Sequence, residues 1–204
     1  LAIGASLAGF VTAKSRAEET AKTWFKENEN GLRDRLKNLE DDVVSMAEQA
    51  RKTIERTRQK AMAEAEKNLS SASGSAPTQV SPETKASLTE ADTALKDKPE
   101  SQYTYSDWNI RAYAAHSNKN LALAAEYWGN AAQAQDASDL DIAKALVNQG
   151  IAFEQGKQTD KALASFEEVT KRFGTSLAPE LQEPVARALI NQGNNYEICK
   201  QTDK

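Results

Sequence analysis

The chain has 204 residues, with 26 Lys and Arg against 30 Asp and Glu, so its formal net charge is −4 at pH 7. This balance gives no electrostatic basis for binding nucleic acid, and we expect no nucleic-acid partner. The single cysteine, Cys199, excludes an intramolecular disulfide and a cysteine-cluster zinc site, and the single histidine excludes a multi-histidine metal centre. Only 39% of the residues are hydrophobic, so we expect one part to form a core and another to be solvated or elongated.

Residues 1–13 carry no charge, and Lys14 and Arg16 follow directly. We interpret this segment as the end of a transmembrane helix that residues preceding Leu1 would complete, since a span needs about 20 apolar residues. The two basic residues would then hold the following chain in the cytoplasm. Two alternatives remain open. The segment could be the tail of a signal peptide, which would make the protein exported or periplasmic, or the end of a soluble helix.

Residues 14–69 have the composition of a long charged helix, rich in Ala, Glu, Lys, Arg and Leu, with Asn30-Gly31 as one plausible break. Apolar residues spaced alternately by four and three predict a coiled-coil seam: Phe25, Leu32, Leu36, Leu39, Val43, Met46 and Ala50. A parallel homo-oligomer joined through residues 25–50 is one interpretation. A single amphipathic helix lying on its own domain or on a membrane surface is the other. Beyond the seam, Ile54, Ala61, Ala65 and Leu69 continue an apolar stripe only if the register shifts.

Residues 70–104 are predicted to be a linker that contains one short helix. Residues 70–81 are small and polar, which is the composition of a flexible segment. Ser81 and Pro82 then resemble an N-cap followed by proline at the first helical position, which predicts a helix over 82–97.

The C-terminal half repeats itself. Residues 142–161 realign on residues 185–204 with an offset of 43, and 12 of the 20 aligned positions are identical. Self-similarity of this size at a fixed spacing predicts stacked helical hairpins. We expect three copies, at about 105–138, 142–176 and 185–204, the last of them incomplete. Gly150 and Gly193 are expected where one helix approaches another closely, and Pro184 is expected to open the last helix.

These residues resemble the tetratricopeptide repeat family. Its pattern of a large residue, Leu-Gly and Tyr on the first helix, and A-x₃-F on the second, is matched in the middle copy by Leu146, Gln149, Gly150, Phe153, Ala162 and Phe166. The last copy has Leu189, Gln192, Gly193 and Tyr196, and a degenerate first copy has Trp108, Arg111, Ala112, Ala115, Ala124 and Trp128. The spacing of 43 residues departs from the 34 of the family. The resemblance implies an α-solenoid over residues 105–204, so the whole chain is predicted to be all-α.

The resemblance also implies a groove lined by first-helix side chains that point away from their hairpin partner. Six residues are candidates for binding a protein or peptide there: Lys144, Asn148, Ile151, Arg187, Asn191 and Asn194. Family members often use a groove asparagine to hold the backbone of an extended peptide and basic residues to hold a carboxylate. The alternative is that Asn148 and Asn191 only satisfy carbonyl groups between repeats.

The sequence contains no phosphate-binding loop, no nucleophile elbow and no H-E-x-x-H motif, so we expect no enzyme activity and no cofactor or metal. Asp136, Asp139 and Asp141 lack the spacing of a calcium loop and are interpreted as charge at a helix N-terminus capped by Ser138. We therefore expect a membrane-tethered scaffold for protein–protein interaction. A regulatory module of a larger enzyme and a purely structural coiled-coil oligomer are the alternatives.

Overall fold

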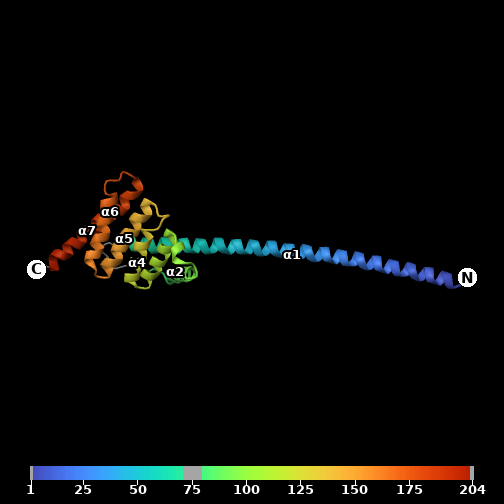
Figure 1. Cartoon of the computed structure of the whole chain (residues 1–204). Helices are drawn as coiled ribbons and strands as arrows, with labels where there is room; N and C mark the ends of the chain where they lie inside the picture. The colour runs from blue at the N-terminus through green and yellow to red at the C-terminus, as the bar shows by residue number, and fades with distance from the viewer. Residues whose placement is uncertain (1, 71–79, 203–204) are drawn as a thin grey trace. The chain divides into compact units, whose positions relative to one another are not determined.

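The computed structural model describes residues 2–70 and 80–202, with side chains for residues 12–69 and 80–197. Every regular element in these ranges is helical, which confirms the all-α class (Figure 1). The flexible segment expected at residues 70–81 lies almost entirely outside them. The chain divides into two compact units, Leu1–Ile54 and Glu55–Lys204.

Helix α1 runs without interruption over Ala2–Ser70. The break expected at Asn30-Gly31 is therefore wrong. Glu29, Leu32 and Arg33 near Gly31 are strong helix formers, and they outweigh the cost of one glycine, about 1 kcal/mol. The side chains of residues 12–57 are all exposed. None of the helices in the described part of the chain contains a stretch that is both long enough and apolar enough to cross a bilayer.

Helix α2 covers Pro82–Leu95, two residues shorter than predicted. Its N-terminus forms as the sequence indicated, because the Ser81 hydroxyl accepts a hydrogen bond from the Thr84 amide at 3.2 Å. Leu88 and Leu95 are buried on one side of the helix. A 3₁₀ turn at Glu100–Gln102 then leads into the repeated region.

The repeated region consists of antiparallel helix pairs followed by one further helix in the described part of the chain. The helices are α3 (Tyr105–Ser117), α4 (Leu121–Ala131), α5 (Asp139–Gln155), α6 (Thr159–Phe173) and α7 (Pro179–Thr202). Each helix packs on the next, and α5 also contacts α3 and α7 directly. The first helices of successive hairpins, α3, α5 and α7, therefore lie side by side.

Of two predicted helix starts, one is confirmed. Helix α5 begins at Asp139, directly after the expected cap Ser138, because Ser138 and Asp141 form a reciprocal capping box. Helix α7 begins at Pro179, and Pro184 lies inside it. The expectation that Pro184 opens this helix is wrong, since Pro179 occupies the first turn and the fixed φ of Pro184 is itself helical.

The turns between paired helices share one backbone conformation. Lys119 in the α3–α4 turn has φ 61°, and Lys157 in the α5–α6 turn has φ 57°. The next amide in each turn bonds back to the first helix: Asn120 N to Ala115 O at 2.9 Å, and Gln158 N to Phe153 O at 2.8 Å. Positive φ is uncommon outside glycine, so its recurrence here shows that the two hairpins repeat in structure.

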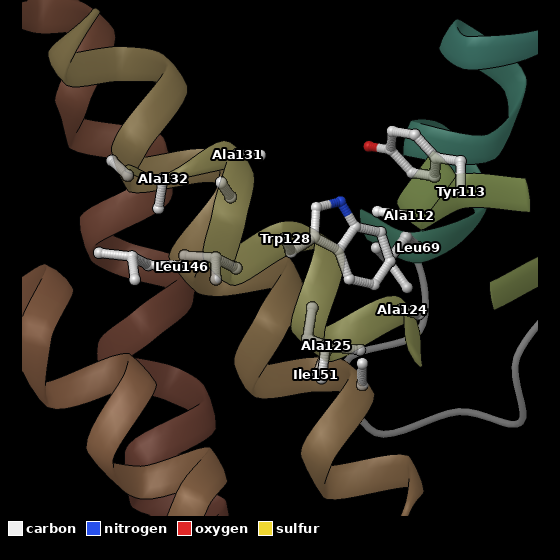
Figure 2. Close-up of a cluster of buried hydrophobic side chains, with 14 of the residues drawn as sticks. Leu69, Ala112, Tyr113, Ala124, Ala125, Trp128, Ala131, Ala132, Leu146 and Ile151 are labelled. Carbon is white, nitrogen blue, oxygen red and sulfur yellow. The ribbon is translucent and has the colours of Figure 1, made fainter. Parts of the chain in front are cut away.

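The core of this unit is centred on Trp128, which is fully buried on α4 (Figure 2). The indole Nε1 donates to Asn109 Oδ1 at 3.0 Å, and the edge of the ring system meets the Tyr113 ring at a centroid distance of 5.4 Å. Between α5 and α6, Gly150 lies against Phe166, where an added Cβ would be 2.4 Å from Phe166 Cε1. This confirms the close approach expected at Gly150. The same expectation at Gly193 is wrong, because no atom lies within 4 Å of a Cβ added there.

Candidate functional site

The face shared by α3, α5 and α7 carries the residues predicted to line a groove. Four of them, Lys144, Asn148, Arg187 and Asn191, are at intermediate exposure or buried, and Asn194 on α7 is exposed. Ile151 is 5% exposed and belongs to the hydrophobic core. The asparagines and basic residues expected in a peptide groove are thus present on these helices, but most of them are buried or partly buried.

The C-terminal end of α1 packs against the rest of the unit Glu55–Lys204. Ala61, Ala65 and Leu69 are buried at 4%, 4% and 2% exposure, and their spacing of four places them on one stripe of the helix. They join the same apolar cluster as Tyr113 and Ile151. Figure 2 shows Leu69 beside the Trp128 and Tyr113 side chains. We call residues 55–69 the α1 tail.

Polar contacts hold the α1 tail at two points. Lys144 Nζ on α5 lies 2.9 Å from Glu66 Oε1, in a pair that is partly shielded from water. On the other side, Glu64 Oε1 accepts from the Ser81 amide at 2.9 Å and Glu64 Oε2 accepts from the Thr84 hydroxyl. These hydrogen bonds hold the pKa of Glu64 below its ordinary value. One predicted groove residue, Lys144, therefore already holds a helix of the same chain.

Asn148 connects two hairpins. Its Nδ2 donates to the Tyr113 hydroxyl at 3.2 Å, and both side chains are buried. Burial raises the pKa of the Tyr113 hydroxyl, and the negative charge of Glu66 raises it further. Tyr113 therefore stays neutral and acts as a hydrogen-bond acceptor beneath the α1 tail.

A second polar seam lies between α5 and α7. Arg187 Nε is 3.5 Å from Glu183 Oε1, and its buried Nη2 has no hydrogen-bond partner among the described residues. Asn191 is 2% exposed, and its carbonyl accepts from Asn195 Nδ2 at 2.8 Å. On α5, burial raises the pKa of Glu154, while a hydrogen bond from Asn195 opposes the shift. The seam is thus rich in amides and carries one buried cation.

Substituting Asn148 by alanine should lower the free energy of unfolding by about 1 to 3 kcal/mol, because the buried Tyr113 hydroxyl would lose its partner. Urea denaturation followed by circular dichroism measures this. Asn194→Ala is the matched control, since Asn194 is exposed, and it should change stability by less than about 0.5 kcal/mol. Equal effects of the two substitutions would show that the Asn148 bond carries no stability.

A third cluster, which sequence reasoning missed, surrounds Arg111 on α3. Its guanidinium lies 2.6 Å from Glu100 Oε1 and 3.2 Å from Asp92 Oδ1, and its Cζ is 4.2 Å from the centre of the Tyr127 ring. Burial alone would lower the pKa of Arg111, but these partners outweigh it and raise the pKa. The alignment of Arg111 with a repeat position gave no sign of this pairing, which joins α2, the 3₁₀ turn and the first hairpin.

Two of the three clustered carboxylates, Asp136 and Asp141, bond to amides at the N-termini of helices, in agreement with their interpretation as helix N-terminal charge. Asp141 Oδ2 accepts from the Ser138 amide at 3.1 Å, and Asp136 Oδ1 accepts from the Tyr105 amide at 2.8 Å. Among the described residues there is no group of three or more His, Cys, Asp or Glu side chains that would hold a metal ion.

His116 packs at the end of α3. Its Nε2 lies 2.8 Å from Gln155 Oε1, and its ring centroid is 5.7 Å from that of Trp128. Burial lowers the pKa of His116, although the hydrogen bond that its Nε2–H donates to Gln155 Oε1 opposes this. The position is that of a side chain packed between hairpins.

The lowered pKa predicts a pH dependence of stability. The unfolded chain takes up a proton at His116 near the ordinary value of 6.5, while the folded chain does so only at lower pH. Wild-type stability should therefore fall as the pH drops below about 6.5, until the folded pKa is reached. Because His116 is the only histidine, His116→Gln should remove this component. Urea denaturation at pH 7.5 and 5.5 gives the comparison, and identical pH profiles of wild type and variant would contradict it.

No protein-family model, curated protein or solved structure matches this chain.

Proposed function

We propose that this chain is a scaffold for protein–protein interaction, in which the hairpins of residues 105–204 bind a helical segment of a protein on the face shared by α3, α5 and α7. The observation that supports this most is the α1 tail. The unit already accepts one amphipathic helix, through the small-residue stripe of Ala61, Ala65 and Leu69 and the Glu66–Lys144 pair. A partner helix with the same pattern would compete with the tail for this position.

The resemblance to tetratricopeptide repeats supports the same proposal, because that family uses the face of its first helices to bind peptides. It also suggests which residues a partner would meet: Lys144, Asn148, Ile151, Arg187, Asn191 and Asn194. Of these, Lys144 and Asn194 are the more accessible. A partner that displaced the tail would find Lys144 free to pair with an acidic side chain.

The test uses a peptide with the sequence of the α1 tail as the binding probe. In the variant Ala61→Glu/Ala65→Glu, two carboxylates enter the buried stripe, so the tail should leave its position. A labelled peptide of residues 55–70, added in trans, should then bind this variant and bind wild type far more weakly. Fluorescence anisotropy measures the binding, and circular dichroism checks that the hairpins of the variant remain folded.

A charge exchange makes the test specific. Lys144→Glu in the same variant should abolish binding of the peptide, and a peptide carrying Glu66→Lys should restore it. Lys171→Glu is the control, since Lys171 is an exposed lysine on α6. A folded variant that binds no peptide would show that this face takes a helix only as a fixed part of the fold.

We further propose that residues 1–13 tether the scaffold to a membrane, with residues 105–204 on the cytoplasmic side. The support is the uncharged segment followed by Lys14 and Arg16. Protease added outside intact cells should spare residues 105–204. A mature protein that starts at Lys14 would favour export instead.

A further inference from the structure

Between Phe25 and Ala50, helix α1 carries a row of large apolar side chains that is open to water. Exposed fractions there include 68% for Phe25, 60% for Leu32 and 69% for Met46. These side chains follow a heptad pattern on a continuous helix. Taking Leu36 as position a, the a positions are Glu29, Leu36, Val43 and Ala50, and the d positions are Phe25, Leu32, Leu39 and Met46. A helix with such a stripe is stable in water when a second helix covers it.

We propose that a second copy of this chain covers this stripe in an antiparallel coiled coil, with Leu36 of each copy facing Leu39 of the other. This differs from the parallel stalk that the seam alone suggests. The proposal stands apart from the groove of residues 105–204, because it uses only residues of the first unit. Residues 1–13 of the two copies would lie at opposite ends of the pair, so both segments reach one membrane only when the pair lies along its surface.

The core layers favour the antiparallel pairing. With Leu36 opposite Leu39, Leu32 faces Val43 of the other copy, and the large Phe25 faces the small Ala50. Glu29 faces Met46 and keeps its ion pair with Arg33, which lies 2.9 Å away on the same helix. A parallel dimer would instead place Glu29 against Glu29 and Phe25 against Phe25. Two carboxylates facing each other in the seam repel, and pairs of unequal size fill it more evenly than matched pairs do.

The flanking charges favour the same pairing. In an antiparallel dimer, e positions face e positions and g positions face g positions, because one helix is reversed. Arg33 then faces Glu40 at the e positions, and Arg35 faces Asp42 at the g positions. Two-fold symmetry repeats both pairs, which gives four attractions and no repulsion in this region. The parallel arrangement has only the attraction between Arg35 and Glu40, which its two-fold symmetry repeats once.

The same charges fix the register. A shift by one heptad in one direction brings Glu40 against Glu40 and Asp42 against Asp42. A shift in the other direction brings Arg33 against Arg33 and Arg35 against Arg35. Like charges therefore oppose both neighbouring registers, which is how coiled coils exclude alternative pairings.

Disulfide trapping in the full chain tests the orientation, with Cys199→Ser as background. Leu32→Cys and Val43→Cys are prepared separately, and one of them carries a size tag. In the proposed dimer, position 32 faces position 43, so the mixture should form a disulfide under mild oxidation. Neither variant alone should do so, because eleven residues of helix separate identical positions by about 16 Å, well beyond the reach of a disulfide. Cross-linking of each variant with itself would show a parallel dimer and overturn the proposal.

A charge exchange tests the register without new cysteines. Arg35→Glu should weaken the dimer by about tenfold in sedimentation equilibrium, since two attractions become repulsions. Adding Asp42→Arg should restore the wild-type dissociation constant. In a parallel dimer the second change would restore nothing, because Arg35 would face Glu40 there. A chain that stays monomeric at micromolar concentration, with or without binding to lipid vesicles, would also overturn the proposal.

Discussion

Replacing Trp128 by alanine is expected to remove about 3 to 5 kcal/mol of the free energy of unfolding of the unit Glu55–Lys204, which we call the repeat unit. The side chain is fully buried, and its loss would leave a cavity between α3, α4 and α5. It would also deprive the buried Asn109 of the indole donor at 3.0 Å. Urea denaturation followed by circular dichroism measures the effect, and the expected loss is a large part of the stability of an ordinary domain.

Two further variants separate the contribution of the buried volume of Trp128 from that of its hydrogen bond, and provide a control. Trp128→Phe keeps most of the apolar volume but loses the hydrogen bond and part of the ring system, so its effect should be intermediate, at about 1 to 3 kcal/mol. Trp24→Ala serves as the matched control, because Trp24 is 58% exposed on α1. If Trp128→Ala cost no more than Trp24→Ala, the core would not be centred where the structure places it.

Alanine at two equivalent glycines is expected to change stability in opposite directions. At Gly150, the new methyl group would lie 2.4 Å from the buried Phe166 ring, so Gly150→Ala should cost up to about 3 kcal/mol. At Gly193, 43 residues further along, nothing lies within 4 Å of the added atom. Gly193→Ala should therefore stabilise α7 by up to about 1 kcal/mol, because alanine favours the helix.

A double variant checks whether the effect of Gly150→Ala comes from contact with Phe166. Phe166→Leu combined with Gly150→Ala should be less destabilising than the sum of the two single changes, because the smaller side chain makes room for the methyl group. Thermal denaturation of the four variants is sufficient. The same sign at Gly150 and Gly193 would contradict the close approach.

The hairpins could be predicted from the sequence because their determinants are local. The self-match of residues 142–161 and 185–204 carries the helical spacing of the apolar residues, and Gly150 marks the contact with Phe166. The cap at Ser81 is equally local. The start of α7 was misplaced because two prolines compete, and the sequence does not show which of them lies inside the helix.

The candidate site was predictable only in part. The sequence indicated which residues of α5 and α7 share a face, but not that Asn148 bonds to Tyr113, since that contact joins positions 35 residues apart. One signal of the α1 tail was nevertheless present. The seam of residues 25–50 loses its register before Ala61, Ala65 and Leu69, and these three residues are the ones that bury themselves in the repeat unit. The shift of register marks where the exposed part of the helix ends and its buried stripe begins.

The position of the α1 tail has a consequence for the order in which the molecule assembles. Helices α3 and α4, or α5 and α6, are neighbours in the chain and close over short turns, so they form early. Glu66 and Lys144 are far apart in the chain, and bringing them together closes a long loop. During synthesis, the tail leaves the ribosome before α5 exists. The first part of this unit to be made therefore completes its contacts only after α5 has been made, and its early exposure gives chaperones or another chain time to bind it.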